Sequence, residues 1–113
     1  QGRGGLEHRY YVEKIKAAYL AMEGFTFIEK DDIDLVVETV EFRLAIQLET
    51  GKSDLQANLT KLGRYRADLK YMIATNKPAE IKIAQLLKEL LIPDRENIQV
   101  VYVKDFMNHP PSL

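Results

Sequence analysis

The sequence predicts one α/β domain with a mixed β-sheet and helices on both faces. Three observations lead to this class. A helical apolar pattern opens the chain, three strand-like segments follow it directly, and two more strand-like segments are each preceded by a helical pattern. A three-strand meander followed by helix-linked strands favours a mixed sheet covered by helices. The 113 residues are enough for a single core.

The first helix is expected within residues 6–24. Glu7 lies four residues before Tyr11, so we expect its carboxylate to project from the buried stripe, where it needs a partner or a cation. Gly24 is a natural stop, because glycine tolerates the left-handed conformation that follows many helices. The apolar side chains that recur at helical spacing are Tyr11, Ile15, Ala18 and Met22.

Three strands are expected next, at residues 25–30, 32–38 and 43–50. If residues 40 and 41 form the turn between the last two, Asp34 faces Gln47 and Asp32 faces Glu49. Directly opposite side chains in such a hairpin lie about 5 Å apart.

Alternation along these two strands separates apolar from polar side chains. A divalent cation could bridge the polar set, since hard cations take oxygen ligands. The alternative is a hairpin face that simply meets water. The expected apolar face carries Ile33, Leu35, Val37, Leu44, Ile46 and Leu48, and the opposite face carries Asp32, Asp34, Val36, Glu38, Arg43, Ala45, Gln47 and Glu49.

The second half of the chain alternates helices and strands. Ser53 is a suitable N-cap for a second helix, and Pro78 and Pro93 bracket a third. Strands are expected at residues 71–75 and 98–103. The full order is then α-β-β-β-α-β-α-β in a single domain over residues 1–113, with flexible ends at 1–5 and 108–113. The start QGRGG also suits a domain taken from a longer protein.

Composition excludes several classes of protein. The chain has no cysteine, so disulfides and thiolate metal sites are excluded, and a reducing, cytoplasmic location is expected. No apolar run reaches the roughly 20 residues of a membrane span, so no membrane partner is expected. The net charge of −1 predicts no partner by itself. An acidic segment over residues 23–49 precedes a basic one over 52–70, which suits a metal site beside a phosphate-binding surface or two solvated faces.

The segment ETGKS matches the end of a Walker A loop at Gly51, Lys52 and Ser53. The first glycine of that motif would fall at position 46, which is Ile46. The preceding residues are strand-like, whereas the loop needs a backbone that wraps around phosphates. A nucleotide-binding loop is therefore rejected.

The order of elements, together with GGLEHRYY, DIDLVV and AIQLETGKSDLQANLTK, resembles the PD-(D/E)XK nuclease superfamily, which has a restriction-endonuclease-like fold. These sequence segments are most similar to those of small nuclease-like domains attached to archaeal ATPases and, more distantly, to those of archaeal Holliday junction resolvases. The resemblance covers about residues 6–75. It matches Glu7 to the family's helix acid and Asp34 to its strand aspartate. Gln47 and Glu49 stand where the family has an acid and a lysine.

The resemblance implies a metal-dependent DNA endonuclease that uses Mg²⁺ or Mn²⁺. Asp34 and Glu49 would bind the metal with help from the amide oxygen of Gln47. Lys52 would replace the missing lysine, and Glu7 would act through a water. The DNA phosphates would be held by Arg9, Asn58, Lys61 and Arg64. His8 and His109 do not form a ligand set by their spacing.

Two other functions remain open from the sequence. The substitutions at Gln47 and Glu49 suit a catalytically degenerate nuclease fold that acts as a DNA-binding or protein-interaction module. A structural α/β domain that docks on a larger protein is the second alternative. A homodimer would suit two symmetric cuts, and the resemblance also implies association with an ATPase.

Overall fold

The structure is a computed structural model that describes residues 5–22, 26–30, 32–52 and 54–112. The expected order of elements is confirmed, and a short helix follows the last strand. In chain order the elements are α1 (Leu6–Leu20), β1 (Thr26–Lys30), β2 (Ile33–Glu38), β3 (Arg43–Glu49), α2 (Leu55–Arg64), β4 (Leu69–Ala74), α3 (Lys77–Glu89), the 3-10 turn η1 (Arg95–Asn97), β5 (Ile98–Tyr102) and α4 (Val103–Asn108).

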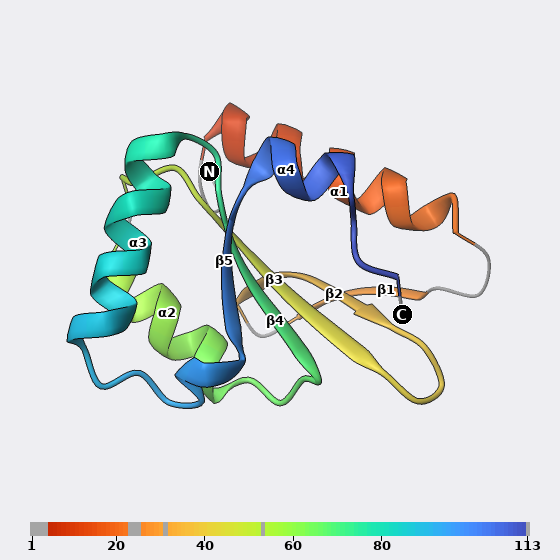
Figure 1. Ribbon diagram of the computed structural model, residues 1–113. Coiled ribbons are helices and arrows are strands. Elements are labelled where there is room, and N and C mark those ends of the chain that lie inside the picture. The colour runs from red at the N-terminus through yellow and green to blue at the C-terminus, as the bar shows by residue number, and fades with distance from the viewer. Residues whose placement is uncertain (1–4, 23–25, 31, 53, 113) are drawn as a thin grey trace.

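In the described part of the chain, five strands form one sheet in the order β1-β2-β3-β4-β5. The strands β1, β2 and β3 pair antiparallel, and β3, β4 and β5 pair parallel. Helices α1 and α4 pack on one face of this sheet, and α2 and α3 pack on the other (Figure 1). The α/β class and the mixed sheet with helices on both faces are therefore confirmed.

The β2–β3 hairpin has the register that the sequence predicts. Leu35 pairs with Ile46 and Val37 with Leu44. The amide of Thr39 donates to the carbonyl oxygen of Phe42 at 2.8 Å, which closes the turn around residues 40 and 41. Continued by one residue, this register brings Asp34 to Gln47.

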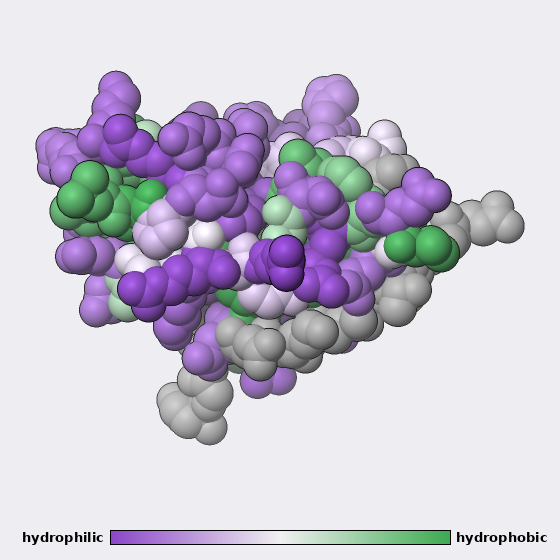
Figure 2. Space-filling view, turned by 90° about the horizontal axis from the view of Figure 1, so that it is seen from below, coloured by the Kyte–Doolittle hydropathy of each residue, from purple (hydrophilic) through white to green (hydrophobic). Residues whose placement is uncertain are grey.

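One core lies on each face of the sheet. Ile15 and Tyr19 of α1 pack with the side of β2 and β3 that carries Leu35 and Ile46. Leu59 and Leu62 of α2 pack with the other side, which carries Ala45 and Met72. Apolar side chains of the helices and strands are thus buried on both faces of the sheet. The face seen in Figure 2 is mostly hydrophilic, with hydrophobic residues in separate patches.

The expected alternation of β2 fails at its first residue. Ile33 packs with Val36 in the core under α2 and α3, and not with Leu35 and Val37. Asp32 has a φ of 68°, and the β1–β2 register shifts between Ile28 and Lys30. This left-handed residue turns the chain just before β2, so Ile33 leaves the face that strict alternation assigns to it.

The helix boundaries correct one expectation. The N-cap of α2 is Asp54, whose side chain accepts from the Ala57 amide at 3.1 Å. Ser53, the expected cap, lies outside the described residues, as does Gly24, the expected stop of the first helix. Helix α3 carries Pro78 in its first turn, as expected, and Asn76 caps it.

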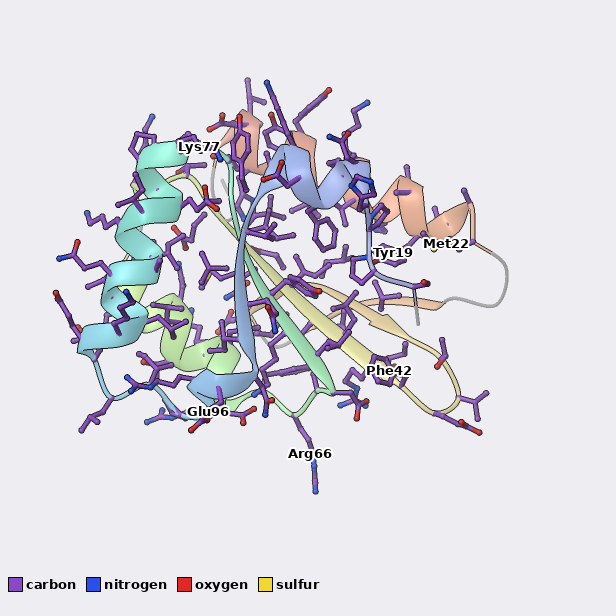
Figure 3. All side chains as sticks on the ribbon, viewed as in Figure 1. Tyr19, Met22, Phe42, Arg66, Lys77 and Glu96 are labelled. Carbon is purple, nitrogen blue, oxygen red and sulfur yellow. The ribbon has the colours of Figure 1, made fainter. Side chains whose placement is uncertain are left out.

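The last strand ends earlier than expected. β5 stops at Tyr102, and the chain continues as α4, which begins at the last residue of the expected strand and ends at the first residue of the expected flexible end. Phe106 of α4 is buried and lies 5.3 Å from the Tyr71 ring, centroid to centroid. The Tyr19 hydroxyl donates to the Pro111 carbonyl at 2.8 Å, and Tyr19 lies beside the C-terminal segment in Figure 3. Burial raises the pKa of Tyr19, so this donor stays protonated.

Candidate functional site

The candidate site lies at the end of the β2–β3 hairpin, where side chains link the two strands in place of main-chain hydrogen bonds. The paired register of the two strands extends to Leu35 and Ile46. One residue further, the Asp34 amide donates to Gln47 Oε1 at 2.9 Å, and the Leu48 amide donates to Asp34 Oδ2 at 2.8 Å. The Asp34 and Gln47 side chains therefore replace main-chain pairing, and the Asp34 carboxylate is held at the end of the hairpin ladder.

A cavity of about 220 Å³ opens at this point, between β2, β3, α1 and α2. Its wall is mostly polar. The polar side chains that line it are His8, Asp32, Asp34, Gln47, Glu49, Asp54, Asn58 and Lys61. Of the residues proposed from the sequence, the structure brings together Asp34, Gln47, Glu49, Asn58 and Lys61.

Glu49 is the most deeply buried acid of the cavity. Its exposed fraction is 2%, and that of Gln47 is 3%. The Asn58 side-chain amide donates to Glu49 Oε2. Burial of a carboxylate is costly without compensating partners. Asn58, which was expected to contact phosphate, instead contacts the acid, so α2 positions Glu49.

His8 is a site residue that the sequence analysis missed. Its Nε2 lies 3.0 Å from Asp34 Oδ2, and the exposed fractions of the two side chains are 13% and 7%. Helical spacing could have identified His8 as a residue on the buried side of α1, because it lies four residues before Val12 and seven before Ile15, which are both buried. Only the phase of the stripe was misjudged.

Glu7 does not project from the buried stripe. The core side of α1 is formed by Val12, Ile15 and Tyr19, so the stripe is rotated from the one predicted. Glu7 is exposed and lies outside the cavity. Its carboxylate accepts a long hydrogen bond of 3.4 Å from the Thr75 hydroxyl.

The basic residues proposed from the sequence are dispersed. Lys61 reaches the cavity, and its Nζ lies 3.9 Å from Asp32 Oδ2. Arg64 shares a shallow groove with Lys61 along α2. Lys52 is exposed beside Gly51, whose φ of 94° makes the turn after β3, and it does not line the cavity. Arg9 lies in a groove on the outside of α1.

The donor chemistry of the cavity fits a hard divalent cation in part. Within the described residues, no three His, Asp or Glu side chains come close enough together to hold a metal. Two carboxylates with little exposure, Asp34 and Glu49, line the cavity. Mg²⁺ is commonly bound through one or two carboxylates while it keeps several waters. The Gln47 oxygen already accepts from the Asp34 amide, so we regard that side chain first as a link between strands.

No protein-family model matches the chain, and comparisons with curated proteins and with solved structures return no significant match. Among the described helices, none has the length and apolar character that a membrane span requires.

Proposed function

We propose that this chain is a nuclease-like domain of the PD-(D/E)XK type that binds Mg²⁺ or Mn²⁺ through Asp34 and Glu49 and hydrolyses phosphodiester bonds in DNA. The observation that carries the proposal is the position of Glu49. A carboxylate that is 2% exposed lines the same cavity as Asp34, and Lys61 lines this cavity too. Two buried acids beside a surface lysine suit a cation and an anionic substrate.

The surrounding residues would hold the two acids in place. His8 and the Leu48 amide both reach Asp34 Oδ2, and Asn58 reaches Glu49 Oε2. When bound, the cation would lower the pKa of a water and stabilise charge on the phosphate. Such fixed partners keep donor atoms in position without reorganisation during the reaction.

The positive charge of the site is best supplied by Lys61. Its ammonium group lies at the cavity, whereas Lys52 is exposed outside the lining. A lysine at the rim can attract a backbone phosphate without reading base sequence. Arg64, on the same helix face, would extend this contact along α2. Lys52 and Glu7 are not included in the proposed catalytic set.

A nicking assay on supercoiled DNA tests the proposal. With Mn²⁺, the unmodified chain should convert supercoiled to open-circular DNA, and Asp34→Asn and Glu49→Gln should each lower the rate about 100-fold or more. Asp105→Asn, at an exposed position of α4, is the matched control and should leave the rate unchanged. Cleavage that survives both site substitutions would rule out this site.

A DNA-binding module without catalysis is the second candidate, and one observation favours it. Gln47 stands where an acid is expected, and its oxygen is already used by the Asp34 amide. This candidate predicts a DNA mobility shift without divalent cation and no nicking. In Lys61→Ala, the slope of log affinity for DNA against log salt concentration should become less steep by about 1, because one phosphate contact is lost. Loss of the DNA mobility shift in the Asp34→Asn variant, measured in excess metal chelator, would argue against a module that binds DNA by electrostatic attraction alone.

A further inference from the structure

The hydrogen bonds of the Asp34 carboxylate are unevenly divided between its two oxygens. Oδ2 accepts from the Leu48 amide at 2.8 Å and also lies 3.0 Å from His8 Nε2. In the described part of the chain, both hydrogen bonds to this carboxylate end on Oδ2. Oδ1 is therefore the oxygen that these two donors leave for another ligand.

The two donors come from different parts of the fold. Leu48 belongs to β3, and its bond to Asp34 takes the place of main-chain pairing at the hairpin end. His8 belongs to α1, which packs on one face of the sheet. The hairpin does not need this second donor to satisfy the Leu48 amide. What His8 adds is a second hydrogen bond on the same oxygen, which limits rotation of the carboxylate about its last side-chain bond.

The contact between His8 and Asp34 lies inside the candidate site. The two side chains are 13% and 7% exposed, and both line the cavity that Glu49 also lines. A hydrogen bond from His8 requires a hydrogen on Nε2. The imidazolium ion and one of the two neutral tautomers both carry this hydrogen, so His8 can be the donor in either charge state.

We propose that His8 is a positioning residue, whose Nε2 donates to Asp34 Oδ2 and thereby directs Oδ1 toward the divalent cation. This inference rests on the proposed function, because it concerns the same cation. It assigns His8 no bond to the cation, since its Nε2 faces Asp34 in the structure. Carboxylates that bind metals are commonly held by such hydrogen bonds, and loss of one typically lowers metal affinity about 10–100-fold.

Titration with Mn²⁺, followed by the electron paramagnetic resonance signal of the free ion, tests this role without any DNA cleavage. His8→Phe keeps a flat ring but removes the donor, and it should weaken Mn²⁺ binding about tenfold or more. His8→Gln places an amide nitrogen near the position of Nε2 and should restore most of the affinity. Glu13→Gln, at an exposed position of the same helix, is the matched control and should bind Mn²⁺ like the unmodified chain.

Two further measurements separate positioning from other roles of His8. Urea unfolding will show that each variant is folded under the conditions of the titration, so that a lower affinity does not come from unfolding. Electron spin echo spectra of the Mn²⁺-loaded chain report whether a histidine nitrogen is bound to the ion. We expect no such nitrogen coupling in the unmodified chain.

The outcomes distinguish this inference from the proposed function. If Glu49→Gln loses Mn²⁺ binding while His8→Phe binds as tightly as the unmodified chain, the role of His8 is overturned and the cation site stands. Equal losses in His8→Phe and His8→Gln would also overturn this role, as would a nitrogen coupling that disappears in His8→Phe. An unmodified chain that binds no Mn²⁺ would overturn both the inference and the proposed function.

Discussion

Asp34 connects the stability of the hairpin end to the proposed site. Its Oδ2 accepts from the buried Leu48 amide and lies against His8 Nε2, while its own amide donates to Gln47. The same carboxylate is one of the two proposed cation ligands. Substitutions at this residue therefore need a stability measurement beside any activity assay.

Asp34→Ala should destabilise the fold by about 1–3 kcal/mol, because the Leu48 amide loses its acceptor in a buried setting. Asp34→Asn should cost less, since its carbonyl oxygen can still accept from that amide. Urea unfolding of the two variants measures the difference. Equal losses for both would show that this hydrogen bond does not hold the hairpin end.

Lys70 is a buried cation on the α2 and α3 side of the molecule, with an exposed fraction of 2%. Its Nζ donates to the Gly63 carbonyl at 2.7 Å and to Asp94 Oδ2 at 2.6 Å. The hydrogen bond from Lys70, followed by one from Asn97, holds the pKa of Asp94 below its usual value. Lys70 thus joins β4 to α2 and to the loop before β5.

Lys70→Met should cost about 1–3 kcal/mol near neutral pH, because the Gly63 carbonyl loses its donor. The Asp94 pKa is lowered in the fold, so its contribution is present above the unfolded pKa of about 4 and is lost as pH falls through the folded value. The difference in free energy of unfolding between the unmodified chain and the variant should therefore become smaller below about pH 4. Unfolding curves from pH 7 to pH 3 measure it, and a gap that widens toward pH 3 would contradict this account.

At the scale of elements, the position of α2 depends on one glycine. A Cβ at Gly63 would lie 2.1 Å from the Pro93 carbonyl oxygen and 3.3 Å from Ile92 Cγ2. The chain before η1 therefore crosses this end of α2 in direct contact with its backbone. This approach also brings Asp94 to Lys70.

Gly63→Ala tests whether this contact outweighs helix propensity. Alanine favours a helix interior over glycine by about 1 kcal/mol. Overpacking costs about 1–3 kcal/mol, and a carbonyl at 2.1 Å belongs at the upper end. We expect net destabilisation of about 1–2 kcal/mol by urea unfolding, with Gln56→Ala as an exposed control on α2 that changes little. A stabilised Gly63→Ala would mean that the loop moves away freely.

Two helices show what the sequence could and could not predict. The existence of α1 was evident from its spacing, but its phase was not, because tyrosines and leucines occur on both of its faces. Glu7 was consequently preferred to His8. Helix α4 has six residues, and so short a helix depends on packing, here of Phe106 against Tyr19 and Tyr71. Its first residue, Val103, continues the apolar run of β5, which concealed the boundary.

At the scale of the whole molecule, the hairpin register could be predicted from the sequence and the cavity could not. The hairpin register followed from a short turn and period-two alternation, and it brought Asp34 and Gln47 together. The partners of the two acids come from α1 and α2, which pack on opposite faces of the sheet. His8 contacts Asp34, and Asn58 contacts Glu49. These are tertiary contacts, which the alternation of side chains along a strand does not predict.

The central claim is that Asp34 and Glu49 share a divalent cation, and a crystal soaked in Mn²⁺ tests it most directly. We predict an anomalous difference peak between the two carboxylates, with waters completing the coordination, and no peak there in Glu49→Gln crystals treated identically. An empty cavity at saturating Mn²⁺ would contradict the claim, as would a peak that persists unchanged in Glu49→Gln.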